Sequence, residues 1–261
     1  MIAIKGAGEM ASAVAWRLFM ANLKKIFMME TANPLAVRRE VSFCEAVHEG
    51  KKEVEGVEGV LSHNPDEVKA TWRKEKIAVI VDPVWQTLKS IRADAVVDAI
   101  LAKTNLGTSM NDASLVIGLG PGFTAGHDVD MVIETNRGHN LGRILTSGDA
   151  ELNTGVPGPI GGYGEERVLR APANGEFRTR VSIGDLVEKG EIVGSVAGED
   201  VAALINGVVR GLIRPRAQVT QGLKIGDIDP RGDTGFCYTI SDKARAISGS
   251  VLEAIMRVHN C

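Results

Sequence analysis

The sequence is poor in the residues that mark disulfide and zinc proteins. Its three cysteines, Cys44, Cys237 and Cys261, lie far apart and form no CxxC pair. An odd number of scattered cysteines argues against a disulfide framework, and their spacing matches no zinc site. We therefore expect a protein of a reducing compartment without a metal centre.

Long apolar runs and a charge excess of one sign are also lacking. No apolar run approaches the roughly 18 residues of a membrane span. The chain opens MIAIKGAG, without the basic and then apolar pattern of a secretory signal. A net charge of -3 gives no global attraction to nucleic acid or to an anionic membrane. We expect a cytoplasmic protein that binds neither.

What is present is an ordinary folded composition, with 44% hydrophobic and 24% charged residues over a length sufficient for two domains. The first segment reads strand, turn, helix, strand: MIAIK, GAGEMA, EMASAVAWRLFMA and KKIFMME. Gly6, Gly8 and Ala11 fit a Gly-x-Gly-x-x-Ala fingerprint, in which N–H groups and the helix dipole face an anion. Glu30, at the end of the second strand, is placed to accept hydrogen bonds from ribose hydroxyls. This predicts a Rossmann-like domain that binds a phosphate-bearing ligand; alternatively, the glycines only shape a tight turn.

Two aspartates follow or end apolar runs later in this half. Asp82 comes directly after IAVIV, where strands of open parallel sheets line ligand crevices, so it is a candidate catalytic residue. It could equally cap the next helix. Asp98, in ADAVVDAILA, would be costly to bury unpaired and therefore either faces a polar crevice or has a partner.

A second glycine-rich segment, VIGLGPGFTAGHDVD, lies between two apolar runs, and RGHNLGR follows the second run. Glycines permit positive φ angles and let backbone N–H groups converge on an anion, while arginine binds phosphate or carboxylate through paired N–H groups. We expect the two segments to meet and form an anion pocket; the alternative is a rigid turn beside solvated arginines. The predicted pocket residues are Gly118, Gly120, Gly122, Arg137, His139, Asn140 and Arg143.

The sequence pattern changes after a Gly- and Pro-rich connection at residues 147–166, and an internal repeat follows. APANGEFRTRVSIGDLVEKGEIVGSV from Ala171 aligns without gaps to ALINGVVRGLIRPRAQVTQGLKIGDI from Ala203. Both halves place Asn-Gly between β-like runs, which is a hairpin signal. The two halves are expected to interlock into a small closed barrel without exposed edges.

This repeat resembles the biotinyl/lipoyl barrel-sandwich domain, in which the acceptor lysine lies on the hairpin between the repeats. Here that hairpin reads AGEDVA, with Glu199 and Asp200 and no lysine. We therefore expect neither biotin nor lipoate, and a module that docks a partner or covers a ligand.

The tail contributes a helix that begins near Asp242 and is expected to pack back on the first domain. Cys237, just before it, is a candidate catalytic thiol, because a helix N-terminus favours a thiolate; a buried inert thiol is the alternative. His127, in the glycine loop, is a candidate proton donor or metal ligand. The predicted fold is α/β: a Rossmann-like domain over residues 1–164, a barrel-sandwich hybrid over 165–230, and a C-terminal segment with a helix over 231–261.

Several long motifs together resemble one family. LVIGLGPGFTAGHDVD, RGHNLGR, NTGVPGPIGGY, GLKIGDIDPRGD and CYTISDKARAI, with GAGEMASAVAWRL in the first half, are similar to the YqeB-like family of selenium-dependent molybdenum hydroxylase accessory proteins. The resemblance runs essentially from end to end. It implies a role in maturing a hydroxylase that carries molybdopterin and selenium, but it brings no established catalytic set.

Combined with the glycine loops, the resemblance leads to a hypothesis. Residues 6–8 and 118–126, with RGHNLGR, would cradle molybdenum cofactor, as molybdopterin or its dinucleotide, during selenium insertion or delivery to the hydroxylase, and Cys237 would present sulfur or selenium. One alternative is an NAD(P)-linked oxidoreductase with His127 or His139 as proton carrier. Another is a non-catalytic adaptor that docks the hydroxylase. Whether the chain is an enzyme stays open, and a homo-oligomer is expected.

Overall fold

A computed structural model describes residues 1–152, 155–156 and 158–259. The chain forms two compact units: unit 1 is Met1–Pro34, Val41–Thr154 and Ile240–Cys261, and unit 2 is Leu35–Glu40 and Gly155–Thr239. Leu35–Glu40, which we placed in the first predicted domain, thus belongs to unit 2, and the C-terminal helix belongs to unit 1. Residues 153, 154 and 157 of the predicted connection, and Cys261, lie outside the described residues.

Unit 1 is built on a nine-stranded mixed sheet in the order β10-β9-β7-β6-β1-β2-β5-β4-β3. The strands from β4 to β9 in this order pair in parallel, whereas β3 and β10 run antiparallel at the two edges. A separate two-stranded sheet joins β8 and β11. The bounds are β1 Ile2–Lys5, β2 Ile26–Glu30, β3 Lys51–Val54, β4 Val57–Ser62, β5 Ile77–Val81, β6 Ala95–Asp98, β7 Leu115–Leu119, β8 Thr124–Ala125, β9 Met131–Ile133, β10 Ile144–Leu145 and β11 Gly148–Asp149.

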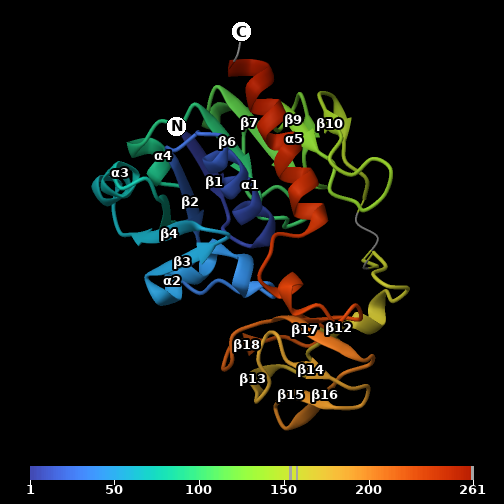
Figure 1. Cartoon of the computed structure of the whole chain (residues 1–261). Coiled ribbons are helices and arrows are strands. Elements are labelled where there is room, and N and C mark those ends of the chain that lie inside the picture. Colours follow the sequence, from blue (N-terminus) through green and yellow to red (C-terminus); the bar gives the residue numbers. More distant parts are fainter. Residues whose placement is uncertain (153–154, 157, 260–261) are drawn as a thin grey trace. The chain divides into compact units, whose positions relative to one another are not determined.

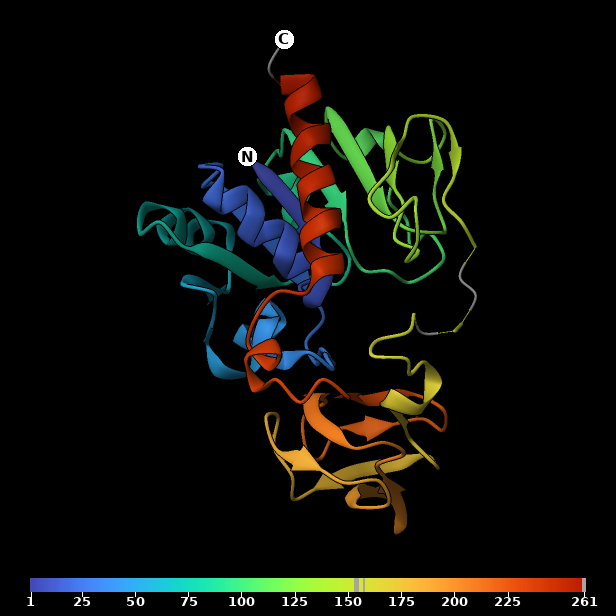
Figure 2. The ribbon, with the colours of Figure 1, turned by 45° about the vertical axis from the view of Figure 1, so that its right-hand side comes forward.

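Helices cover both faces of this sheet. Alternate strand residues such as Ala3 and Phe27 share one buried cluster with Val68 and Trp72 of α3. On the other face, α1 and α5 lie side by side, and α5 also contacts β7 and β9 (Figures 1 and 2). No helix in the described part of the chain is long and apolar enough to cross a membrane. The helices are α1 Glu9–Met20, α2 Ala46–Glu49, α3 Pro65–Arg73, α4 Thr87–Ser90 and α5 Asp242–His259, with 3-10 helices η1 Arg39–Val41, η2 Phe43–Glu45, η3 Met110–Asp112, η4 Glu165–Arg167 and η5 Thr234–Cys237.

The prediction of a Rossmann-like domain is wrong, because the sheet is larger and mixed. The segment KKEVEGVEGVLS supplies the antiparallel pair β3 and β4, and β4 extends the main sheet by pairing with β5. At the other edge the chain turns back after β9 and adds β10 antiparallel to it. A fingerprint within one strand–helix–strand segment is local, so it does not determine which strands join the edges of the sheet.

Unit 2 contains two four-stranded sheets, in the orders β12-β19-β17-β14 and β16-β15-β13-β18. The strands within each sheet pair antiparallel, and Phe177 and Val209 are among the buried residues of the shared core. The prediction of one small closed barrel is therefore wrong: two sheets with edge strands form instead. The bounds are β12 Val168–Arg170, β13 Gly175–Thr179, β14 Leu186–Val187, β15 Ile192–Val196, β16 Glu199–Ala202, β17 Gly207–Leu212, β18 Gln218–Val219 and β19 Lys224–Asp229.

The internal repeat is visible in these sheets. The strands β13, β14 and β15 begin at the positions aligned with the starts of β17, β18 and β19. The middle strand of each repeat pairs with a strand of the other repeat: β14 pairs with β17, and β18 pairs with β13. The Asn-Gly pairs are not hairpin turns. Asn174 accepts a hydrogen bond from the N–H of Gln221 at 2.8 Å, and Asn206 accepts one from the N–H of Lys189 at 2.7 Å, so both asparagines tie one repeat to the other.

Candidate functional site

The carboxyl ends of β1, β6, β7 and β9 are neighbours in the sheet of unit 1, and the loops that leave them touch one another. A Cβ atom added to Gly6 would lie 3.3 Å from Cα of Ile100, just after β6. One added to Gly120, just after β7, would meet the side chains of Leu101 and Thr135. The turns that carry the predicted site residues therefore lie along one edge of the sheet.

The turn between β1 and α1 is held from within the protein. Gly6 has a φ of 87°, a conformation that glycine adopts without strain. One carboxylate oxygen of Glu30 accepts from the N–H of Ala7 at 2.8 Å, and the other accepts from the N–H of Thr31 at 2.7 Å. Glu30 thus fastens the turn, and a ribose hydroxyl would have to displace one of these bonds.

The start of α1 is open. Gly8 is the N-cap residue, and a Cβ atom there would meet nothing within 4 Å. Among the residues that the structure describes, the N–H groups of Gly8 and Met10 have no hydrogen-bond acceptor. Ala11 is fully buried, as expected of a small residue where helix and strand pack closely. An open helix start with free donors attracts negative charge.

A second helix start lies beside it. The Ser241 hydroxyl donates to a carboxylate oxygen of Glu9 at 3.0 Å and accepts from the N–H of Ala244 at 3.3 Å, so it caps α5 while touching α1. The Arg137 guanidinium donates to both carboxylate oxygens of Asp242, at 2.7 and 2.9 Å. The loop after β9 is thereby fastened to the start of α5.

Lys243 lies at this junction, and sequence reasoning missed it. Its side chain is half-buried, and its amine has no hydrogen bond or ion pair with any residue that the structure describes. Burial, followed by the positive charge of Arg137, lowers the pKa of Lys243 below its ordinary value of 10.5, while the carboxylates of Glu9, Glu134 and Asp242 act in the opposite direction. An ammonium group that makes no ion pair with the carboxylates near it can bind an anionic ligand.

The segment RGHNLGR forms a braced loop around a cavity. Buried Glu134 accepts from the N–H groups of Asn136 and Glu151 at 2.6 and 2.7 Å, and the side-chain amides of Asn136 and Asn140 donate to Glu151. A cavity of about 380 Å³ is lined by His139, Asn140, Leu141, Gly142 and Arg143. Three predicted residues, His139, Asn140 and Arg143, therefore come together there, whereas Arg137 turns to Asp242.

The glycines of residues 118–122 have a different task. A Cβ atom at Gly118 would collide with the ring of Phe123, and one at Gly122 would lie 2.8 Å from the backbone between Lys103 and Thr104. The N–H of Gly120 donates to the carbonyl of Ile133 at 2.9 Å. These glycines let the loop pack closely on the protein itself. Their role as anion donors stays a prediction.

Two predicted catalytic residues are not available at this edge: Asp82 already accepts hydrogen bonds from the protein, and His127 lies at the opposite side of the sheet. Asp82 accepts from the N–H groups of Gln86 and Thr87 at 3.0 and 2.6 Å, which is the capping alternative. Burial raises its pKa, but hydrogen bonds from Thr87 and Gln86 outweigh burial and lower it overall. His127 is exposed beside Asp128 on the amino-terminal side of β9, opposite to the carboxyl ends described above.

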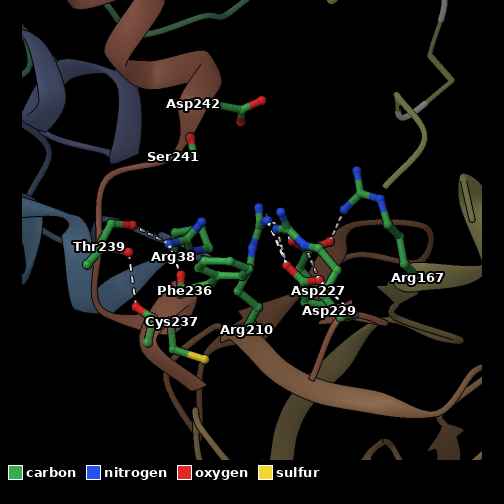
Figure 3. A network of polar contacts seen from close by, with 12 residues as sticks. Arg38, Arg167, Arg210, Asp227, Asp229, Phe236, Cys237, Thr239, Ser241 and Asp242 are labelled. Carbon is green, nitrogen blue, oxygen red and sulfur yellow. Dashed lines mark hydrogen bonds and ion pairs between the residues drawn. The ribbon is translucent and has the colours of Figure 1, made fainter. Parts of the chain in front are cut away.

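Cys237, the third predicted catalytic residue, belongs to the core of unit 2. It is fully buried, and its thiol donates weakly to the carbonyl of Val209 at 3.7 Å. Its sulfur points away from the guanidinium of Arg38 (Figure 3). Burial raises the pKa of this thiol, so the environment opposes a thiolate. This arrangement is that of the buried-thiol alternative, and the proposed handling of sulfur or selenium stays a prediction.

Two buried aspartates of unit 2 are paired with arginines of the protein. In unit 2, Asp227 and Asp229 of β19 both pair with Arg210, and Arg167 pairs with Asp227 (Figure 3). Arg231 pairs with Asp229 as well. Each acidic side chain therefore has two arginine partners. This network is a structural element of the unit.

The sequence allowed either a polar crevice or a partner for Asp98 in unit 1, and the structure shows a partner. Its carboxylate accepts from the Thr108 hydroxyl at 2.6 Å, and the buried amine of Lys5 donates to Thr108 and Asp112 at 2.8 and 2.7 Å. Burial raises the pKa of Asp98.

Among the described residues, no group of three or more histidine, cysteine or acidic side chains is arranged to hold a metal ion.

The comparisons with known proteins give one close relative. No protein-family model matches the chain. It is 48% identical over 256 residues to the uncharacterized protein YqeB of Escherichia coli K12, an alignment that covers 98% of this chain and 47% of the relative. The chain is therefore similar to YqeB over nearly all of its own length and spans about half the length of that curated relative. The relative's name assigns it no activity.

Solved structures show only distant likenesses. A succinylglutamate desuccinylase/aspartoacylase from Rhodobacter sphaeroides is 15% identical, with a TM-score of 0.24 over 55% of this chain and 60% of the other. An aspartoacylase family protein from Mesorhizobium loti is 13% identical, with a TM-score of 0.27 over 87% and 84%. With scores this low, these likenesses establish neither a shared fold nor a shared activity.

Proposed function

We propose that the chain is an accessory factor in the maturation of a selenium-dependent molybdenum hydroxylase, and that unit 1 holds the phosphate end of molybdenum cofactor, or of its dinucleotide, at the start of α1. The motif resemblance to the YqeB-like accessory family supports this role. The long alignment with YqeB supports membership of that group. The partner in this account is the hydroxylase.

The observation that carries the proposal is the unsatisfied polar surface at the junction of α1 and α5. The free N–H groups of Gly8 and Met10 and the unpaired amine of Lys243 are donors without acceptors among the described residues. A phosphate supplies several acceptor oxygens and a negative charge, which suits both helix starts. The fit applies to the phosphate end alone, because the described residues offer no metal-ligand cluster.

The chain's own residues would bind and orient. Glu30 keeps the β1–α1 turn in shape, and Arg137, through Asp242, holds the loop after β9 against α5. Lys243 would take up or retain a proton when an anion binds beside it, because a nearby negative charge raises the pKa of an amine. The cofactor would supply the molybdenum and pterin chemistry when bound.

Lys243→Gln tests the placement. Removing a charge-assisted contact should weaken binding of molybdopterin dinucleotide by about 10- to 100-fold, measured by titration calorimetry with NAD as comparison. Lys69→Gln is the matched control, since Lys69 is an exposed lysine on α3. Equal affinities of the two variants would overturn the placement. Absence of binding by the unaltered chain, with co-purification of the hydroxylase, would favour the adaptor.

The same site predicts a pH dependence. The Lys243 amine loses its proton at a lower pH than an ordinary lysine, and with that proton it loses its attraction for phosphate. Affinity for the dinucleotide should therefore fall as the pH rises through the lowered pKa, and this fall should be absent from Lys243→Arg, which stays charged. A titration at several pH values that shows the same slope for both proteins would contradict the assignment.

A further inference from the structure

Unit 2 contains a charged hollow that the proposed function does not use. A cavity of about 520 Å³ is lined by Glu176, Arg178, Thr179, Pro215 and Arg216. The lining comes from two segments, the end of β13 and the turn between β17 and β18. Two arginines therefore face one hollow from positions far apart in the sequence.

Backbone hydrogen bonds hold the two segments together. The N–H of Arg216 donates to the carbonyl of Phe177 at 2.7 Å, and the N–H of Phe177 donates to the carbonyl of Ala217 at 2.9 Å. These bonds bring the backbones of Arg178 and Arg216 together. Both arginine side chains are exposed, and the one acid that lines the hollow with them, Glu176, pairs with Arg178 at 3.0 Å. The hollow keeps an excess of positive charge.

The backbone at Arg216 has a bearing on how the site can be tested. Its φ is 67°, in the left-handed region that glycine and asparagine adopt most readily. Replacing Arg216 by glycine therefore removes the guanidinium without straining the turn.

We propose that Arg178 and Arg216 form a second anion site, which binds a small molecule through a doubly charged oxyanion such as a phosphate group. Each guanidinium presents paired N–H groups that match the oxygens of such an anion. Because Glu176 competes for Arg178, a dianion is favoured over a singly charged carboxylate. The Thr179 hydroxyl already donates to the carbonyl of Val193 at 2.6 Å, so recognition falls to the arginines. This site does not depend on the function proposed for unit 1.

The test uses pyrophosphate as the probe, with acetate for comparison, and titration calorimetry of the full chain at constant ionic strength. Saturable binding of pyrophosphate is expected, with acetate much weaker. Arg216→Gly should weaken binding by about tenfold or more, because half of the guanidinium pair is lost. The same change removes the left-handed strain, so the unfolding temperature should stay unchanged or rise. Arg178→Gln should weaken binding similarly.

Two controls separate the outcomes. Arg73→Gln removes one exposed positive charge on α3 of unit 1 and should leave binding unchanged. Lys243→Gln should bind pyrophosphate at this site as the unaltered chain does, even when it no longer binds the dinucleotide. The inference is wrong if pyrophosphate does not saturate the unaltered chain, or if Arg216→Gly and Arg178→Gln bind it as Arg73→Gln does.

Discussion

At the scale of single residues, Asp229 at the end of β19 has a buried carboxylate with two arginine partners. Its carboxylate accepts from the Arg231 guanidinium at 2.6 and 2.9 Å and from Arg210 at 3.2 Å. Burial raises its pKa, but Arg231 and then Arg210 outweigh burial and lower it to about 2. The ionised form is therefore favoured by the folded state.

Asp229→Asn should destabilise unit 2 by about 2 kcal/mol near neutral pH, as expected for a pKa lowered by nearly two units. Because the folded pKa lies below the unfolded one, this stability is present above the unfolded pKa of about 3.9 and is lost as the pH falls through the folded pKa. Urea unfolding at several pH values checks this prediction. Asp200→Asn, an exposed change on β16, is the control. A stability difference that does not shrink on acidification would contradict it.

The sequence predicted which residue types gather at the site, but not which of them are already occupied. Glu30 ends a strand and Asp82 follows one, as the pattern indicated, yet both carboxylates accept hydrogen bonds from backbone N–H groups of the protein itself. Lys243 carried no signal, because its lowered pKa comes from burial and from Arg137, which is distant in the sequence. Such occupancy depends on tertiary packing, and periodicity does not record it.

At the scale of elements, the interlocked repeats define unit 2. Asn174 and Asn206 occupy matching places, and each accepts a hydrogen bond from the other repeat. The N–H of Gly222 donates to the carbonyl of Ala171 at 2.9 Å, and the N–H of Gly190 donates to the carbonyl of Ala203 at 2.8 Å. These asparagines, alanines and glycines, which are identical in the two repeats, thus join the two halves.

Asn174→Ala and Asn206→Ala should each lower the free energy of unfolding by about 1 kcal/mol, the usual net value of one such hydrogen bond. Equal losses are expected, because the two bonds are equivalent by the repeat. Asn33→Ala, an exposed change in unit 1, should have little effect. Denaturant unfolding measures all three. A loss in only one of the repeat variants would show that the bonds are not equivalent.

The alignment of the repeats agrees with the positions of three strand pairs, but the sequence did not predict how the strands pair. The strands β13, β14 and β15 begin at positions aligned with β17, β18 and β19, because matched residues mark matched elements. The two separate sheets of unit 2 were not predicted, and neither were β3, β4 and β10 in the main sheet of unit 1. Pairing brings distant segments together, and a local pattern contains no information on the partner.

At the scale of the whole molecule, the account assigns a separate anion site to each unit. Unit 1 offers the helix starts with Lys243, and unit 2 offers the hollow with Arg178 and Arg216. The curated relative is about twice as long as this chain, so partners and activity of the longer protein belong to the proposal.

Hydrogen–deuterium exchange of the full chain, with and without molybdopterin dinucleotide, tests the central claim most directly. Backbone amides at the start of α1 are among the groups proposed to donate to the phosphate. The account predicts slower exchange in residues 8–11 and at the start of α5 when the dinucleotide is bound, and loss of this protection in Lys243→Gln. Binding with unchanged exchange at these positions, or with protection only elsewhere, would contradict it.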